Sequence, residues 1–435
     1  MPLLLTPELG LLHLSTASVV ASVIHFSLDF SIFHSHSAIY RENQQLHRVM
    51  SEVFAMKLAR KLDLRELLTK KSFFLFGPRA TGKSTLIQEQ FGDSAQIFDL
   101  LNSRLFLQLS SSPHDLEALI GSETNKIVVL DEIQRVPELL NEVHRLIESK
   151  GIRFLLTGSS ARKLRRGNVN LLAGRAWQAE MFPLTKQEIP AFDLERYLRF
   201  GGLPSVYLSK YPEEELDAYI NTYLREEIAA EGLIRNLPPF SRFLKSIALS
   251  NSEIINFTKL ANDCQVAVST VTEYVKVLED TLVGFMLPAW TESKKRKALK
   301  SGKFYFFDPG VTHALSGTRH LERNSNLYGR SFEQFIGMEI RAYLSYQRIK
   351  LDVCFWRTTH GAEVDFLIGD QTAIEVKSAR KVSERDLKGL RLLEEENRFK
   401  NFILVSQDRQ EAQYGNMKVM HYSNFLDALW AGLLD

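Results

Sequence analysis

The chain has 435 residues, 45% of them hydrophobic, so it is long enough for two or three domains with substantial cores. Its formal net charge at pH 7 is +2, which excludes a global basic field that would draw the whole chain to nucleic acid. Cys264 and Cys354 lie far apart and lack metal-ligand spacing, so we interpret them as two packed thiols in a reducing, cytoplasmic compartment.

Residues 1–55 differ from the rest of the chain. Residues 9–28 contain no Asp, Glu, Lys or Arg and are long enough to cross a bilayer, but Ser, Thr and His dilute the stretch. No basic segment precedes it, as a signal peptide would require. We expect a disordered leader or a misplaced start, with Met50 or Met56 as the natural first residue. A membrane is expected only if residues 9–28 are real and inserted. Residues 57–70 then predict a basic helix.

A phosphate-binding loop is the first informative motif. Residues 72–76 predict a buried strand, and a helix is expected from Ser84 onward. Between them, Gly77 to Ser84 fits the pattern G-x-x-x-x-G-K-S/T, whose backbone N–H groups and helix start hold phosphate. Lys83 is expected to reach the β- and γ-phosphates in catalysis, and Ser84 to ligate Mg²⁺. The residues predicted to bind ATP are Gly77, Pro78, Arg79, Ala80, Thr81, Gly82, Lys83, Ser84 and Thr85.

Strands are also predicted at residues 95–100 and 126–131, and the second ends in two acids. This is the Walker B pattern, in which Asp131 supports the metal and Glu132 polarises the attacking water. An exposed strand end is the alternative interpretation. Residues 153–160 predict a further buried strand that ends in hydroxyls, of which Thr157 or Ser159 can sense the γ-phosphate. We assign Thr157 to the nucleotide site, although an ordinary strand exit also explains the pattern.

Several arginines follow, and one of them could stabilise charge in the transition state. We select Arg175 as catalytic because Gly174 frees the backbone beside it. A solvated basic face is the alternative. The other candidates are Arg162, Arg165 and Arg166.

The middle of the chain predicts mainly helices. Residues 193–200 and 213–230 have the spacing of helices, and Gly201 to Pro204 predict a break between them. We interpret this part of the chain as a lid or connector. Helices at 253–261 and 269–279, the second capped by Ser269, and a strand at 283–288 predict a winged helix. The second helix would present Thr270, Thr272, Glu273 and Lys276 to a DNA major groove or to a protein. The basic run at residues 294–303 would contact phosphates or form a solvated loop.

A second constellation lies in the last third. A helix at residues 329–339 carries Glu333, and strands are predicted at 351–358, 363–368 and 372–377. Side chains alternate along a strand, so Glu375 and Lys377 share one face, and Asp365 on the adjoining strand can meet them. We predict that Glu333, Asp365 and Glu375 hold Mg²⁺, and that Asp365, Glu375 and Lys377 are catalytic in phosphodiester cleavage. Charges on a solvated hairpin are the alternative.

These motifs, together with Gly201 to Pro204, resemble those of a family of prokaryotic AAA-type ATP-binding proteins. The C-terminal domain of that family is similar to PD-(D/E)XK nucleases. The resemblance covers about residue 56 to the end, and it implies an ATPase core, a winged-helix linker and a restriction-endonuclease-like domain. Val364 precedes Asp365, where the nuclease pattern has proline.

We therefore expect an α/β fold: a phosphate-loop NTPase with a parallel sheet, then a winged helix and a nuclease-like α/β domain. The expected divisions are a leader (1–55), an ATPase core (56–192), a lid (193–246), a winged helix with the basic run (247–303) and a nuclease-like domain (304–435). The expected function is ATP binding and hydrolysis with Mg²⁺ and action on or with DNA. The alternative is a nucleotide-dependent switch that binds a protein partner and carries an inactive nuclease-like domain. Assembly into a homo-oligomer is left open.

Overall fold

The computed structural model describes residues 58–122, 127–159, 172, 174–224, 234, 236–293, 295–297, 299 and 301–434. The leader and its residues 9–28 lie outside these ranges, as do Arg162, Arg165, Arg166 and residues 225–230. Within the described ranges, no helix is both long enough and apolar enough to span a bilayer.

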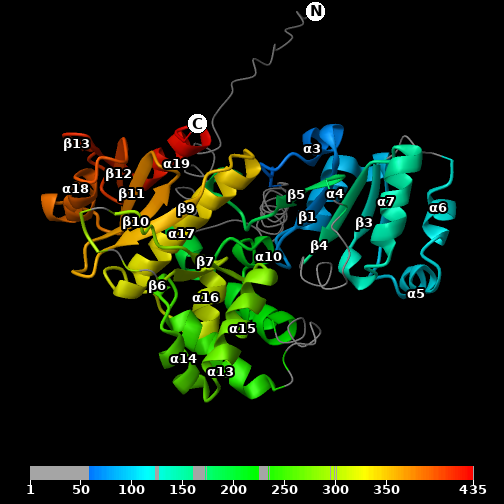
Figure 1. The fold of residues 1–435 in the computed structure, drawn as a ribbon, viewed down its shortest axis with the longest axis horizontal. Coiled ribbons are helices and arrows are strands. Elements are labelled where there is room, and N and C mark those ends of the chain that lie inside the picture. Colours follow the sequence, from blue (N-terminus) through cyan, green and yellow to red (C-terminus); the bar gives the residue numbers. More distant parts are fainter. Residues whose placement is uncertain are drawn as a thin grey trace, which may run out of the picture. The chain divides into compact units, whose positions relative to one another are not determined.

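A five-stranded parallel sheet forms the first part of the fold, in the order β2-β3-β4-β1-β5 (Figure 1). It was predicted as a parallel sheet, and the structure confirms this. Its strands are β1 Ser72–Phe76, β2 Ala95–Asp99, β3 Ile127–Asp131, β4 Phe154–Gly158 and β5 Ala176–Glu180. The accompanying helices are α3 Leu64–Lys70, α4 Lys83–Phe91, α5 Ser103–Ser111, α6 Asp115–Ile120 and α7 Leu139–Lys150, with 3-10 turns at Gly92–Ser94 and Ile133–Arg135.

Alternation along β1 explains why helices cover both faces of this sheet. Phe73 and Leu75 pack in the same core as α4, whereas Phe74 and Phe76 pack with α5, α6 and α7. Every residue of β1 is buried, as expected for a central parallel strand.

The predicted helix at 57–70 begins later than expected. Asp63 caps α3 by accepting hydrogen bonds from the backbone N–H groups of Arg65 and Glu66. Residues 58–62 are not helical, and the Arg60 side chain is buried among distant partners. The cap at Asp63 is a stronger local signal than the leucine spacing.

The middle of the chain combines helices with a small antiparallel sheet in the order β6-β8-β7. The helices are α9 Leu194–Phe200, α10 Pro204–Tyr207, α11 Pro212–Ala218, a π-helical turn Tyr219–Leu224, α13 Leu237–Leu249, α14 Phe257–Cys264, α15 Val268–Asp280 and α16 Pro309–Ser316, and a 3-10 turn lies at Lys186–Glu188. The strands are β6 Glu253–Ile254, β7 Gly284–Leu287 and β8 Lys303–Phe306.

Two details of the winged-helix prediction were wrong. The first helix starts only at Phe257, because Asn256 caps it and Glu253–Ile254 pairs with β8 instead. The second helix begins at Val268, with Ala267 rather than Ser269 at the cap position. The predicted boundary at 303/304 also falls inside β8, whose backbone pairs with β6 and β7.

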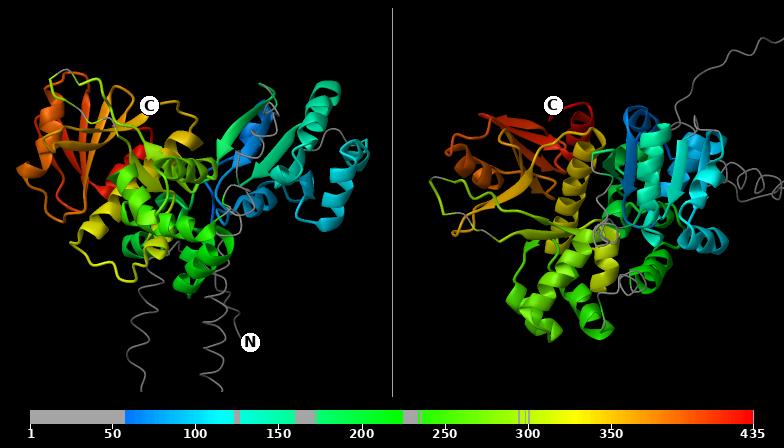
Figure 2. Two further views of the ribbon diagram at one scale, coloured as in Figure 1. Left: turned by 60° about the horizontal axis from the view of Figure 1, so that its bottom comes forward. Right: turned by 45° about the vertical axis from the view of Figure 1, so that its right-hand side comes forward.

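The C-terminal part contains a six-stranded mixed sheet in the order β13-β14-β12-β11-β10-β9. Helices α17 and α19 cover one face of this sheet and α18 covers the other (Figures 1 and 2). Their buried side chains accordingly fall into two separate cores. The elements are α17 Asn326–Tyr346, β9 Val353–Arg357, β10 Glu363–Ile368, β11 Thr372–Lys377, a 3-10 turn Glu384–Leu387, α18 Lys388–Glu394, β12 Asn401–Ser406, β13 Ala412–Tyr414, β14 Met417–His421 and α19 Tyr422–Trp430.

Candidate functional site

The phosphate-binding loop joins the carboxyl end of β1 to the start of α4. Gly82 precedes α4 with a φ of 91°, and no side chain caps the first amides of this helix. These amides are therefore open to an anion at the positive end of the helix. Gly77 must be a glycine, because a Cβ there would lie 2.6 Å from the carbonyl oxygen of Met181.

The loop side chains divide into buried and exposed groups. Lys83 is 6% exposed, and its Nζ donates to the carbonyls of Gly77 at 2.7 Å and Pro78 at 3.1 Å. The Lys83 ammonium therefore lies inside the curl of the loop. Ala80, Ser84 and Thr85 are exposed, so they are accessible to a nucleotide.

Ser84 and Asp131 meet although they are far apart in the sequence. The Ser84 hydroxyl donates to Asp131 Oδ2 at 2.9 Å. The structure thus brings together two of the residues predicted to hold Mg²⁺, and a hydroxyl beside a carboxylate is the oxygen donor set this ion prefers. The residues present therefore fit Mg²⁺ at this position.

Thr157 connects the two acidic residues of the Walker B pattern. Strand β4 lies between β1 and β3, so the carboxyl ends of all three strands are neighbours. Thr157, at the carboxyl end of β4, therefore lies beside Asp131 and Glu132 at the end of β3. The Thr157 hydroxyl donates to Asp131 Oδ1 and accepts from the backbone N–H of Glu132 at 3.1 Å. In this structure Thr157 orients the acidic residues.

Glu132 adopts a backbone conformation that is uncommon for its type. Its φ is 61°, in the left-handed region, and its carboxylate accepts a hydrogen bond from Gln134. Strained backbone of this kind clusters at functional sites. Ser159, the alternative to Thr157, accepts a hydrogen bond from Gln134 at 3.2 Å.

Arg175 does not join this site within its own chain. It immediately precedes β5, and its side chain pairs with Glu148. Because β5 runs parallel to β1, Arg175 lies at the edge of the sheet opposite the loop, roughly 16 Å away for a five-residue strand. The structure therefore does not bring Arg175 to the nucleotide loop of its own chain, and a catalytic role for Arg175 stays a prediction.

Arg60 is a loop contact that sequence reasoning missed. Its guanidinium donates to the carbonyls of Thr81 at 2.8 Å and Phe182 at 2.7 Å, and to the Tyr346 hydroxyl at 3.2 Å. It also pairs with Glu188 at 3.1 Å. No motif marks Arg60, since its partners are far away in the sequence.

The second constellation is assembled in part as predicted. Asp365 lies on β10, one residue before Phe366, which pairs with Ile374 of β11. Its Oδ2 accepts a hydrogen bond from the Val376 N–H on β11 at 2.9 Å. Lys377 donates to Glu375 on the same face of β11. Glu333 on α17, however, meets Asp365 only through a lysine that we had assigned to the basic run.

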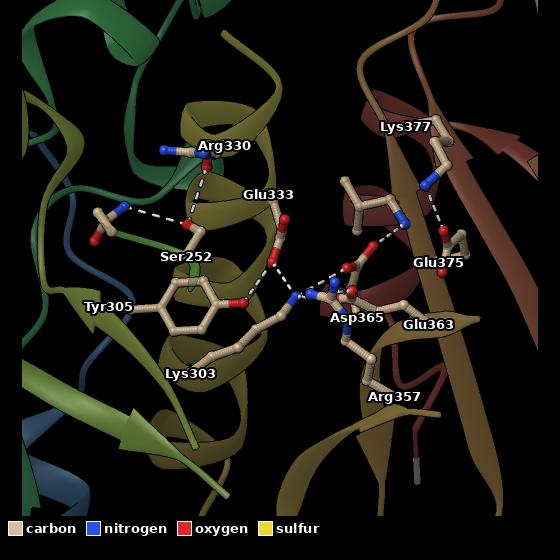
Figure 3. Close-up of polar contacts among 12 residues, drawn as sticks. Ser252, Lys303, Tyr305, Arg330, Glu333, Arg357, Glu363, Asp365, Glu375 and Lys377 are labelled. Atoms are coloured by element: carbon tan, nitrogen blue, oxygen red, sulfur yellow. Dashed lines mark hydrogen bonds and ion pairs between the residues drawn. The ribbon is translucent and has the colours of Figure 1, made fainter. Parts of the chain in front are cut away.

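That lysine is Lys303, the first residue of β8 (Figure 3). Its Nζ lies 2.9 Å from Glu333 Oε1 and 3.2 Å from Asp365 Oδ1, and it also pairs with Glu363. We call this set the Lys303 cluster. The predicted phosphate-contact patch loses its last member, because the Lys303 side chain is only 3% exposed.

Another member of the basic run, Arg296, is also engaged. It donates to the Leu392 carbonyl at 2.9 Å and pairs with Glu395 at 2.6 Å. Lys295 and Lys297 are exposed, and Lys294 and Lys300 lie outside the described residues. The described part of the run therefore offers less free charge than its sequence suggests.

The Lys303 cluster perturbs its acids and bases. Burial raises the pKa of Glu333 to about 7, against the opposing effect of Lys303. Burial and the Asp365 charge raise the pKa of Glu375 well above its usual value. Burial works against the ammonium of Lys377, but Glu375 raises the pKa of Lys377 above its ordinary value.

The predicted metal site formed by Glu333, Asp365 and Glu375 does not fit a metal ion in this arrangement. No group of three or more His, Cys, Asp or Glu side chains in the described ranges is placed to hold one. An ammonium lies between Glu333 and Asp365, and Glu375 is paired separately with Lys377. Only Glu375 Oε2, a buried atom without a hydrogen-bond partner, would favour a further ligand.

Comparison with protein families defines the class of the first domain. Residues 69–190 match the family described as AAA domain. Together with the five-stranded parallel sheet and the loop geometry, this match shows that the first domain has the fold of an AAA-type phosphate-loop protein. Residues 191–322 and 328–425 match two families, each described as a domain of unknown function (DUF8612 and DUF4143).

Similar proteins are found in bacteria and archaea. Uncharacterized proteins of Mycobacterium tuberculosis and Mycobacterium bovis are each 30% identical over 68% of this chain and 66% of their own length. An uncharacterized protein of Methanocaldococcus jannaschii is 24% identical over 70% of this chain and 73% of its own length. The chain thus spans slightly less than two thirds of the mycobacterial relatives.

One solved structure, described as Drosophila ORC bound to AT-rich DNA and Cdc6, matches with 13% identity and a TM-score of 0.20. The match covers 66% of this chain and all of that one. A TM-score this low supports no inference about fold or function.

Proposed function

We propose that this protein binds ATP with Mg²⁺ at the loop between β1 and α4, hydrolyses it, and acts on or with DNA. The observation that carries the ATPase part is the hydrogen bond of 2.9 Å between Ser84 and Asp131. It brings the loop hydroxyl and the Walker B carboxylate together, as Mg²⁺ coordination in phosphate-loop NTPases requires.

Each residue of this site would have a separate role. Lys83 would place positive charge against the β- and γ-phosphates, and the open amides of α4 would hold the phosphate oxygens. Ser84 and Asp131 would hold Mg²⁺, which neutralises charge on the phosphates. Glu132, oriented through the Thr157 hydroxyl, would position the attacking water.

The DNA part of the proposal is supported by two surfaces. Thr272, Glu273 and Lys276 are exposed on α15, the second helix of the winged-helix segment. A hollow of about 810 Å³, at the carboxyl ends of β11 and β12, is lined by basic and acidic side chains. Of these, Arg380, Lys381 and Arg409 are exposed cations, whereas Asp408 already accepts backbone N–H groups. Exposed cations of this kind suit a phosphate backbone.

A second candidate function is a nucleotide-dependent switch that binds a protein partner. Two observations support this alternative. Lys276 is the only cation among the exposed side chains named on α15, and Lys303 is buried instead of joining a surface patch. In this case the C-terminal domain would bind without cutting.

Assembly and location are the remaining parts of the proposal. A homo-oligomer would allow Arg175, which is remote from its own loop, to act at the nucleotide site of a neighbouring subunit. A reducing, cytoplasmic setting is supported by Cys264 and Cys354, which are both free thiols.

The ATPase proposal is tested by the turnover of a Lys83→Ala variant. Removing the ammonium should abolish MgATP hydrolysis in a phosphate-release assay, because the Lys83 Nζ is the charge that lies inside the curl of the loop, against the Gly77 and Pro78 carbonyls. Lys70→Ala is the matched control: Lys70 is exposed and pairs only with Glu66 on α3, so its loss should leave turnover unchanged. Normal turnover in Lys83→Ala would refute the assignment.

A further inference from the structure

Lys303 has the environment of an internal counter-ion. Its side chain is 3% exposed, and its Nζ contacts the carboxylates of Glu333, Glu363 and Asp365. An ammonium has three N–H donors and no acceptor, so these three partners satisfy it completely. The Phe355 ring, 5.4 Å from Nζ, adds a favourable face to the same charge.

The backbone of β8 holds this lysine in place. Lys303 pairs with Ile254 of β6 and with Leu287 of β7, so it begins a strand that has neighbours on both sides. Side chains alternate along β8, and Tyr305 therefore points the same way as Lys303 and donates its hydroxyl to Glu333 (Figure 3). The sheet of the winged-helix segment thus presents two donors to one carboxylate of α17.

The C-terminal domain is attached to the same sheet by its backbone. The N–H of Trp290, just after β7, donates to the Phe355 carbonyl at 2.7 Å, and the Phe355 N–H donates to the Pro288 carbonyl at 3.0 Å. These bonds connect the chain after β7 to β9. Backbone hydrogen bonds from β8 through β7 to β9 therefore hold Lys303 beside the carboxylates.

A divalent ion would compete with Lys303 for the same oxygens. An ion at metal–oxygen distance from Glu333 and Asp365 would lie within a few ångströms of the ammonium, where two positive charges repel strongly. Glu375 offers one carboxylate oxygen at most, because its Oε1 is paired with Lys377. A nuclease site of this type needs a metal to activate water.

We propose that Lys303 is the resident cation of this carboxylate cluster, in place of a divalent metal. The cluster fastens the C-terminal domain to the winged-helix sheet, and it does not cut phosphodiester bonds. The inference concerns residues that form no part of the ATP site, and it stands whether or not ATP is hydrolysed.

The test counts Mn²⁺ ions bound by the nucleotide-free, full-length protein, measured by electron paramagnetic resonance. Wild type is compared with Asp365→Asn and with Glu363→Gln, and circular dichroism confirms that both variants fold. We expect equal Mn²⁺ binding in all three, since any background ion near Asp131 is common to them. Loss of one bound Mn²⁺ in either variant, or Mn²⁺-dependent nicking of DNA by wild type that Asp365→Asn abolishes, would overturn the proposal.

A Lys303→Met variant adds a second test, because loss of a solvent-exposed lysine would leave the melting temperature almost unchanged. Removing the ammonium leaves Glu333 and Asp365 without the cation between them, although Glu363 keeps its ion pair with Arg357. The melting temperature should therefore fall by ~10 °C. Adding Glu333→Gln to Lys303→Met should recover part of that loss, because it removes one of the buried charges. An unchanged melting temperature in Lys303→Met would contradict an internal ion cluster. So would additive effects, in which Glu333→Gln lowers the melting temperature by the same amount in the Lys303→Met protein as it does in wild type.

Discussion

At the scale of single residues, Thr157 shows how an uncharged side chain organises a charged site. Its hydroxyl donates to Asp131 and accepts from the backbone of Glu132. The nearby Ser84 contacts the other oxygen of the same Asp131 carboxylate. The two acids are therefore fixed from β4, not only from their own strand.

We predict that Thr157→Val lowers the kcat of ATP hydrolysis by about 100-fold, because misplacing a catalytic group by about 1 Å costs that much. ATP affinity should be largely kept, since the loop itself is unchanged. The measurement is kcat alongside a nucleotide-binding titration. Thr69→Val is the matched control, since the Thr69 hydroxyl only bonds within α3. Unchanged kcat in Thr157→Val would show that the two acids need no hydroxyl.

The sequence revealed residues that belong to motifs and missed those that act alone. Gly77 to Ser84 and Asp131 were predicted from spacing, and the structure brings them together. Arg60 and Lys303 were not recognised, because each meets partners from several distant segments. Lys303 was assigned to a basic run, in which its neighbours in sequence hid the alternation of β8. A pattern of Lys303 and Tyr305 alternating with Phe304 and Phe306 was the signal that could have revealed it.

At the scale of elements, the strands were predicted better than the helix starts. The residues of β1 and β11 agree with the predicted ranges, because continuous apolar runs and hairpin alternation leave little freedom. Helix starts depend on single caps, such as Asp63 and Asn256, which the leucine spacing does not reveal. The pairing of β6 with β8 spans about fifty residues of sequence, and no local pattern predicts it.

The contact between α16 and α17 predicts a dependence on pH. His313 on α16 is 3% exposed, and its Nε2 lies 2.9 Å from the Ser331 hydroxyl on α17. Burial lowers the pKa of His313 to about 4, compared with about 6.5 in an unfolded chain. Between these values only the unfolded chain binds the proton, so the contribution of His313 to stability is complete above pH 6.5 and is lost as the pH falls.

At pH 5 this loss should amount to about 2 kcal/mol of the free energy of unfolding. Urea unfolding of wild type and His313→Gln at pH 7.5 and pH 5 measures it. Wild type should lose about 2 kcal/mol more than the variant between the two pH values. Other buried acids, such as Glu339, titrate in both proteins, so the comparison cancels them. Equal losses in the two proteins would mean that His313 is protonated in the folded state.

At the scale of the whole molecule, helix α17 takes part in several contacts with the AAA domain. Its last residue, Tyr346, bonds with Arg60, which also holds the loop carbonyl of Thr81. Glu339 on α17 accepts from the backbone N–H of Lys186 at 2.6 Å. The nucleotide loop and helix α17 are therefore joined through buried polar contacts. A change at the loop has a direct structural path to the helix that carries Glu333.

The arrangement of domains could be predicted only in outline. The phosphate-loop motif, the helix-turn-helix spacing and the C-terminal hairpin pattern each predicted one segment of the chain. How β8, the middle strand of the β6-β8-β7 sheet, brings Lys303 to the carboxylates of Glu333 and Asp365 depends on tertiary contacts, which spacing cannot show. The predicted metal site illustrates this limit: its carboxylates are present, but the cation among them is Lys303.

The most direct test of the central claim is ATP hydrolysis by the full-length protein with and without duplex DNA, over a series of salt concentrations. The same reactions, in Mg²⁺ or Mn²⁺, are followed for DNA cleavage. We predict hydrolysis that DNA stimulates, a stimulation that weakens as salt rises, and DNA that stays intact. Hydrolysis indifferent to DNA at low salt would contradict the DNA part of the proposal and favour a protein-binding switch, and absence of hydrolysis would contradict the ATPase itself.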